Sequence, residues 1–191
     1  MNQEAGIIAE VCAALDATHK ERAIEILKDR YPFASIESSG RRYSMSAALS
    51  VFIRDGFVDR YSGARLVFPA TLRLISLILP AEFPFHPNWR TDVCHFAFYE
   101  LSPTIDHVLP VSRGGSDSED NWVTTSMVRN SAKANFTLEE LGWSLRPAGE
   151  MDEWDGLMGW FIAQGKTNPL IGSDAYLRQW FRAAQRTKRQ A

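Results

Sequence analysis

The sequence predicts an α+β protein, with a mostly helical body around a short antiparallel strand pair and a short β-hairpin before that pair. Apolar residues recur at helical spacing near both ends of the chain, at residues 7–15 and 177–184. Between them, residues 104–111 and 121–124 have the composition of strands and are separated by a Gly-Gly turn. A helical segment follows directly. We therefore expect the local order strand, loop, strand, helix.

The composition limits the class of protein. A chain of 191 residues can bury a core without disulfides or structural metals. We expect an N-terminal helical region at residues 1–56, a central domain at 57–146 and a C-terminal helical region at 147–191, together forming one compact unit. The net charge of −2 and the pI near 6.1 argue against nucleic-acid binding by bulk electrostatics.

Several features indicate a protein of a reducing compartment. No apolar run approaches the roughly 20 residues that cross a bilayer, so we expect no membrane partner. The first residues show no secretory signal, and we therefore expect a cytoplasmic location. Cys12 and Cys94 form no C-x-x-C pair, which excludes a four-thiolate zinc site, and both are expected in the core.

Short sequence signals mark the helix ends. Thr18 with Glu21 predicts a capping box that opens a second helix, and Ser44 predicts the N-cap of a third. Residues 57–68 are typical of a short hairpin, and residues 70–79 of a buried helix. Thr137 with Glu140 is a further capping box, and the spacing of apolar residues from Trp154 predicts a helix there.

Residues able to bind metal and transfer protons gather in residues 104–133. Asp106 and His107 are adjacent on the first strand, while Asn130 and Lys133 share one face of the helix that follows. If that face packs over the strand, the oxygens of Asp106 and Asn130 converge. Two oxygen ligands with water suit a hard cation such as Mg²⁺ or Mn²⁺. The imidazole of His107 can accept a proton from an attacking water near neutral pH.

The geometry sets one condition on this site. Neighbouring side chains on a regular strand point to opposite faces, so Asp106 and His107 can serve one site only if the strand distorts or ends there. Pro110 and the Gly-Gly turn favour such a break. Basic residues that could offset phosphate charge are Lys133, Arg129 and Arg113, and His95 is a further candidate for the metal or a phosphate.

With these residues, the stretch resembles the HNH endonuclease family, whose site is the ββα-metal finger. Asp106 and His107 match the family's Asp-His pair, Asn121 matches the middle Asn, and Asn130 matches the last motif position. The spacing of these positions, the Pro and Gly-Gly between them, and Lys133 after them are also typical of the family. The segments outside the motif that resemble a bacterial subgroup are residues 54–57, 59–63, 83–89, 129–134 and 138–143.

The sequence departs from the family in one respect. Many members carry C-x-x-C pairs that bind a structural zinc, and the corresponding places here are residues 59–63 and 126–130, which contain no cysteine. We therefore expect no structural zinc, and we expect packing by the flanking helices to replace it.

The resemblance implies a metal-dependent endonuclease that hydrolyses phosphodiester bonds in DNA, with double-stranded DNA as the expected partner. In this role Asp106 and Asn130 hold one Mg²⁺ or Mn²⁺, His107 is the general base, and Asn121 braces the loop and orients the base. Two alternatives stay open: a non-catalytic DNA-binding or assembly module, and an RNA-directed nuclease. One site cuts one strand, so on duplex DNA the protein would nick one strand, cut the two strands in sequence or act as a homodimer.

Overall fold

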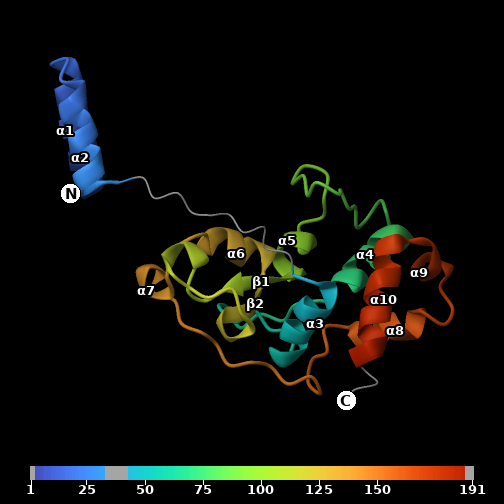
Figure 1. Ribbon diagram of the computed structural model, residues 1–191. Coiled ribbons are helices and arrows are strands. Elements are labelled where there is room, and N and C mark those ends of the chain that lie inside the picture. Colours follow the sequence, from blue (N-terminus) through green and yellow to red (C-terminus); the bar gives the residue numbers. More distant parts are fainter. Residues whose placement is uncertain (1–2, 33–42, 188–191) are drawn as a thin grey trace. The chain divides into compact units, whose positions relative to one another are not determined.

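The computed structural model describes residues 3–32 and 43–187 (Figure 1). The chain divides into two compact units, residues 1–41 and 42–191. The first unit contains α1 (Gln3–Asp16) and α2 (Lys20–Arg30). The second contains, in order, α3 (Met45–Arg54), α4 (Pro69–Ile78), α5 (Ala97–Leu101), β1 (Pro103–His107), β2 (Trp122–Ser126), α6 (Met127–Lys133), α7 (Leu138–Leu141), α8 (Met158–Gln164), α9 (Pro169–Ser173) and α10 (Ala175–Thr187), with short 3-10 helices at Val111–Arg113 and Glu119–Asn121.

The two helices of the first unit form a small apolar cluster of their own. Ile7 and Val11 of α1 are buried against Ala23 and Ile26 of α2. The predicted capping box is wrong, because α2 begins at Lys20 without a side-chain cap, and the Thr18 hydroxyl donates instead to the Ala17 carbonyl. Cys12 is exposed on α1, whereas Cys94 is buried as expected.

The helix α3 belongs to the second unit, so the chain divides at a different place from the expected boundary at residue 56. Ser44 caps α3 as predicted, with its hydroxyl accepting from the Ala47 amide. The buried residues Leu49 and Phe52 of α3 lie in the main core, which explains why this helix groups with the later part of the chain.

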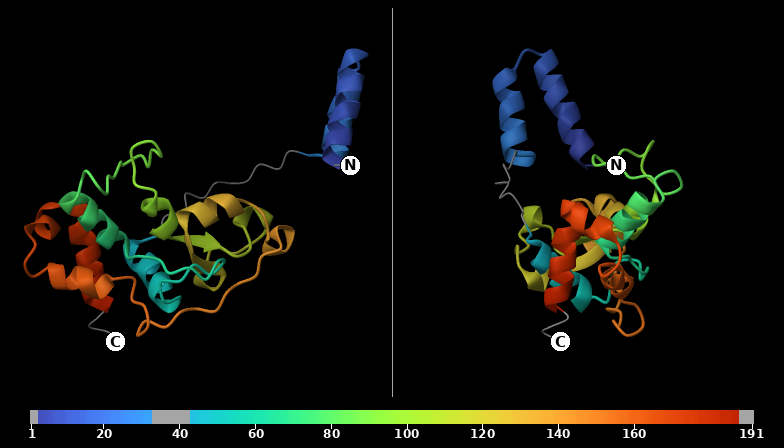
Figure 2. Two further views of the ribbon diagram at one scale, coloured as in Figure 1. Left: turned by 180° about the vertical axis from the view of Figure 1, so that it is seen from behind. Right: turned by 90° about the vertical axis from the view of Figure 1, so that its right-hand side faces the viewer.

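The main core of the second unit lies between α3, α4 and the three C-terminal helices. Phe68, at the start of α4, is fully buried and contacts the rings of Phe161 on α8 and Trp180 on α10. Figures 1 and 2 show α8, α9 and α10 gathered at one end of this unit, with α3 between them and the strand pair. The helical body therefore supports the strands from one side.

The predicted strand, loop, strand, helix order is confirmed. Strands β1 and β2 pair antiparallel, with Asp106 opposite Val123 and His107 opposite Trp122. Ser126 ends β2 and caps α6, because its hydroxyl accepts from the Arg129 amide. The fold class is α+β as predicted, with a mostly helical body around a ββα finger.

Two predicted elements are smaller than expected. The hairpin at residues 57–68 reduces to a single bridge between Val58 and Arg65, since the Val67 amide donates to Leu101 and not to a hairpin partner. The helix expected from Trp154 begins only at Met158. The Trp154 indole instead donates to the Leu66 carbonyl at 2.7 Å. This hydrogen bond fastens the long connection between α7 and α8 to the segment of residues 57–68.

Within the described residues, no helix combines the length and apolar character needed to span a bilayer.

Candidate active site

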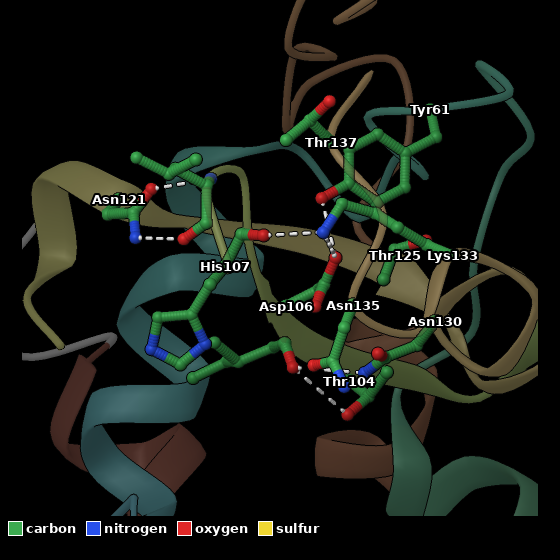
Figure 3. A network of polar contacts seen from close by, with 12 residues as sticks. Tyr61, Thr104, Asp106, His107, Asn121, Thr125, Asn130, Lys133, Asn135 and Thr137 are labelled. Atoms are coloured by element: carbon green, nitrogen blue, oxygen red, sulfur yellow. Dashed lines mark hydrogen bonds and ion pairs between the residues drawn. The ribbon is translucent and has the colours of Figure 1, made fainter. Parts of the chain in front are cut away.

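Asp106 lies near the end of β1 and faces a buried cation. Its Oδ2 accepts a 2.6 Å hydrogen bond from the Tyr61 hydroxyl and lies 3.0 Å from Nζ of Lys133 (Figure 3). The side chain of Lys133 is completely buried, and its ammonium also donates to the His107 carbonyl at 2.7 Å. The ammonium therefore compensates the Asp106 charge and fastens α6 to the end of β1.

Tyr61 is a permanent hydrogen-bond donor to this carboxylate. Burial, together with the negative charges of Asp106 and Asp59, raises the pKa of the Tyr61 hydroxyl far above its ordinary value. The phenol therefore keeps its proton throughout the physiological pH range. Because Tyr61 and Lys133 both contact Oδ2, the orientation of the Asp106 carboxylate is fixed from two directions.

The imidazole of His107 has different surroundings and points away from this cluster in Figure 3. Its Nε2 lies 2.8 Å from Oδ1 of Asp117, and the Trp122 indole nitrogen lies 3.1 Å from both of these atoms. One tautomer satisfies the whole group: Nε2–H and the indole N–H both donate to Asp117. In that tautomer Nδ1 is the acceptor nitrogen of His107.

Asn121 holds the loop that carries Asp117. Its Oδ1 accepts from the Leu109 amide, and its Nδ2 donates to the carbonyls of Leu109 and Ser116, at 2.8 to 2.9 Å. Gly115 allows this closure, because a Cβ there would lie 1.9 Å from the Leu109 oxygen. Asn121 thus closes the loop after His107, and one of its hydrogen bonds holds Ser116, the residue before Asp117.

Asn130 lies on α6 over the first strand, beside Asp106. Its Nδ2 donates to the Ile105 carbonyl at 3.2 Å, one residue before Asp106. This contact orients the amide, so that its Oδ1 is the oxygen available to a ligand. Asn130 and Lys133 of α6 thus both contact the backbone of β1, at Ile105 and His107, and Lys133 also contacts the Asp106 carboxylate.

Two buried carboxylates cover the outer edge of β2. Asp55 accepts from the Thr124 amide at 2.7 Å. Asp59 accepts from the Ser126 amide and the Thr125 hydroxyl, and also from the amides of Tyr61 and Ser62. Asp59 therefore joins the two places where a zinc was considered, residues 59–63 and 126–130, by hydrogen bonds. We expected packing by the flanking helices alone to replace the structural zinc, but these hydrogen bonds of Asp59 also hold the two segments together.

The remaining basic residues of the prediction lie around α6 and α7. Arg129 stacks over the ring of Trp143, and Arg113 forms an ion pair with Glu140 at 3.2 Å. Lys133, which we expected among the phosphate contacts, has no exposed surface and is held by Asp106 and the His107 carbonyl. Its geometry therefore corresponds to a positioning role.

His95 has contacts of its own, in the segment that leads to α5. Its ring stacks on Phe83 with a centroid distance of 4.4 Å, and its Nδ1 accepts from the Ala97 amide. These contacts fix the start of α5, and none of them involves another residue of the predicted site.

A family model described as HNH endonuclease matches residues 98–137. This segment is similar to the HNH family. The match begins within α5 and includes both strands of the finger and α6, and with them all four motif positions from Asp106 to Asn130. Neither the comparison with curated proteins nor the comparison with solved structures gives a significant match.

Three side chains that contact Asp106 or His107 were not predicted from the sequence: Asp117, Trp122 and Tyr61. Asp117 had no signal other than its place in a polar loop, because its role depends on how that loop closes. Trp122 was assigned only to a strand. Tyr61 lay in a segment that resembles the bacterial subgroup, and that resemblance was the available hint.

The donor atoms of the site fit a hard divalent ion. Asp106 Oδ1 is not used in either polar contact of that carboxylate, and Asn130 offers an amide oxygen. No group of three or more His, Cys, Asp or Glu side chains that could hold a metal occurs in the described part of the chain. Two protein oxygens suit Mg²⁺ or Mn²⁺, because these ions keep several water ligands, and would not satisfy a structural zinc.

Proposed function

We propose that the protein is a metal-dependent endonuclease that hydrolyses phosphodiester bonds in DNA. The observation that carries this proposal is the ββα finger in the matched segment, in which Asn130 of α6 bonds the backbone beside Asp106 and His107 ends the same strand. A carboxylate, an amide oxygen and an imidazole at one strand end supply metal ligands and a base, which phosphodiester hydrolysis requires.

His107 acts as the general base through Nδ1. It removes a proton from the attacking water, and the imidazolium that forms is stabilised by Asp117 at Nε2. The Trp122 indole donates to the same carboxylate and limits rotation of both groups. Asn121 keeps the loop closed through Ser116, so that Asp117 remains in place. Asp117 and Asn121 are thus positioning residues in this mechanism.

Asp106 and Asn130 would hold one Mg²⁺ or Mn²⁺, through Oδ1 and the amide oxygen respectively. When bound, the ion polarises the scissile phosphate and offsets charge on the leaving oxygen. Lys133 and Tyr61 hold the Asp106 carboxylate in orientation from the opposite oxygen. Arg129 and Arg113 are the basic side chains that we assign to the phosphate backbone, since their present partners lie at the protein surface.

The test uses purified protein and supercoiled plasmid. We expect nicked and then linear product with Mg²⁺ or Mn²⁺, and none with EDTA. His107→Ala should lower the rate by about 10²- to 10⁴-fold, the range for loss of a general base. His19→Ala, in the first unit, is the control and should cut normally. Full activity in His107→Ala would contradict the assignment, and RNA of the same sequence, tested in parallel, decides between the two substrates.

A non-catalytic DNA-binding module is the second function to consider. The observation that favours it is the 3.0 Å ion pair between Asp106 and Lys133, because a carboxylate already compensated by an ammonium attracts a metal less strongly. Duplex binding without cleavage at any Mg²⁺ or Mn²⁺ concentration would support this module and contradict the nuclease.

A further inference from the structure

A cavity of about 330 Å³ lies outside the HNH finger, between α4, the segment before α5 and the start of α10. Its volume falls within the range of small-molecule sites, about 300 to 1,000 Å³. Its wall is mostly apolar and includes four aromatic rings and one acid–base pair: Phe85, Trp89, Phe98, Tyr176, Arg73 and Asp174. None of these residues has a role in the proposed chemistry.

The aromatic wall offers flat faces of the kind on which another ring can stack. Phe98 is in contact with Phe85 and Trp89, at centroid distances of 5.0 and 6.1 Å. Stacking of an unpaired base on an aromatic side chain is favourable and tolerant of sequence, since every base has a π-face.

The polar end of the cavity is neutral but rich in hydrogen-bonding groups. The Arg73 guanidinium lies 4.6 Å from the Phe85 ring centroid, and its single contact with Asp174 is long, at 3.4 Å. Guanidinium donors therefore lie beside a carboxylate acceptor and over the ring of Phe85. A nucleobase edge presents the complementary donors and acceptors, whereas a phosphate would be repelled by Asp174.

The cavity is connected to the HNH site along β1. Ser102, which lines it, directly precedes β1, and Asp106 lies four positions further along the extended strand, about 13 Å away at roughly 3.3 Å per residue. A neighbouring groove of about 290 Å³ shares Trp89, Ser102 and Tyr176 with the cavity and continues to Thr104 and Ile105. The Ile105 carbonyl at its end is the one that Asn130 contacts.

We propose that this cavity receives one unstacked nucleobase of the nucleic acid that the HNH site cuts, within about four nucleotides of the scissile phosphate at roughly 3.4 Å per nucleotide. The inference rests on the proposed function, because it assumes a nucleic-acid substrate at Asp106. It assigns the aromatic cavity to substrate selection and predicts that DNA with an unpaired base binds better than a perfect duplex.

The experiment measures binding by fluorescence anisotropy, using the His107→Ala protein with Mg²⁺ so that cleavage does not interfere. The probes are two labelled duplexes of one sequence, fully paired or with a single unpaired nucleotide. We expect the second to bind about tenfold more tightly. Phe85→Leu should reduce this preference below twofold and leave binding of the paired duplex within twofold, and Arg73→Gln should weaken the preference as a second, independent variant.

Phe96→Leu is the matched control, because Phe96 is an exposed ring beside α5 that does not line the cavity. It should keep the full preference. Equal binding of the two duplexes, or a preference that survives in Phe85→Leu and Arg73→Gln, would overturn the inference while leaving the nuclease proposal intact. Absence of binding to both duplexes would overturn both. RNA versions of the probes show whether the base comes from DNA or RNA.

Discussion

Asp106 and His107 are neighbours on β1, yet their side chains have separate partners. Asp106 contacts a buried ammonium and a phenol, Lys133 and Tyr61. His107 contacts a half-exposed carboxylate and an indole, Asp117 and Trp122. The partners of Asp106 come from α6 and the segment of residues 57–68, whereas those of His107 come from β2 and the loop between β1 and β2. One strand end therefore carries two independently supported groups, the proposed metal ligand and the proposed base.

The two neighbours keep the alternating directions that a regular strand gives to successive side chains. Asp106 faces α6, whereas the buried imidazole of His107 lies against Asp117 and Trp122. The Lys133 ammonium connects the two neighbours through the backbone, since it contacts the carboxylate of one and the carbonyl of the other. The two groups should consequently respond differently to substitution, in stability for Asp106 and in rate for His107.

The largest expected effect is on stability, from Lys133→Met. Loss of this buried partner leaves the Asp106 charge uncompensated, and we expect the free energy of unfolding to fall by about 3 to 5 kcal/mol in urea denaturation. The double variant Lys133→Met/Asp106→Asn should recover much of that loss, because the lone charge is removed. Lys166→Met, at an exposed position, is the control. If Lys133→Met were as stable as Lys166→Met, the ion pair between Lys133 and Asp106 would have no structural role.

The next effect is on catalysis, from Asp117→Asn. The asparagine retains the size of the side chain but cannot stabilise an imidazolium, and we expect kcat to fall about 10- to 100-fold with little change in KM. Asp117→Glu should recover part of the rate, whereas a purely structural role would predict no such recovery. Asp120→Asn, an exposed acid of the same loop, should cut normally. An unchanged kcat in Asp117→Asn would remove this residue from the mechanism.

The smallest effect is expected from Tyr61→Phe, which deletes one hydrogen bond to Asp106. Such bonds to charged groups contribute about 1.5 to 3 kcal/mol, so the free energy of unfolding should fall by about 2 kcal/mol. The pKa of Tyr61 is raised in the folded protein. The contribution of its hydroxyl to the free energy of unfolding is therefore fully present below the ordinary tyrosine pKa of about 10 and declines only above it. Urea denaturation at pH 6 and pH 9 should therefore give the same difference.

Tyr31→Phe, at an exposed tyrosine of the first unit, is the control for that comparison and should change stability little at either pH. A difference between wild type and Tyr61→Phe that disappears between pH 6 and pH 9 would mean that the phenol ionises, contrary to its burial.

The features that could be predicted from the sequence depend on short-range patterns. Ser44 and Thr137 cap their helices as expected, because a cap is decided within four residues. Asn121 and Gly115 were recognisable because the loop they close is local. The spacing of the four motif positions is typical of the HNH family. The order of strand, loop, strand and helix could be predicted from residues 104–133 alone.

The features that could not be predicted depend on contacts between distant segments. Tyr61 reaches Asp106 across 45 residues, and Asp59 reaches Ser126 across 67, with no local pattern to indicate either pair. Lys133 was expected at a phosphate because an isolated lysine on a helix is usually exposed. Its burial depends on an acid and a carbonyl that only the folded strand brings to it.

In the proposed mechanism Asp106 holds the metal and His107 does not. The most direct measurement is the affinity for Mn²⁺ in the absence of DNA, by electron paramagnetic resonance or calorimetry, for wild type, Asp106→Asn and His107→Ala. We predict that Asp106→Asn weakens Mn²⁺ binding at least about tenfold and that His107→Ala leaves it within twofold while lowering the cleavage rate by about 10²- to 10⁴-fold. Equal weakening by both variants, or undiminished binding in Asp106→Asn, would contradict the division of roles between these two neighbours.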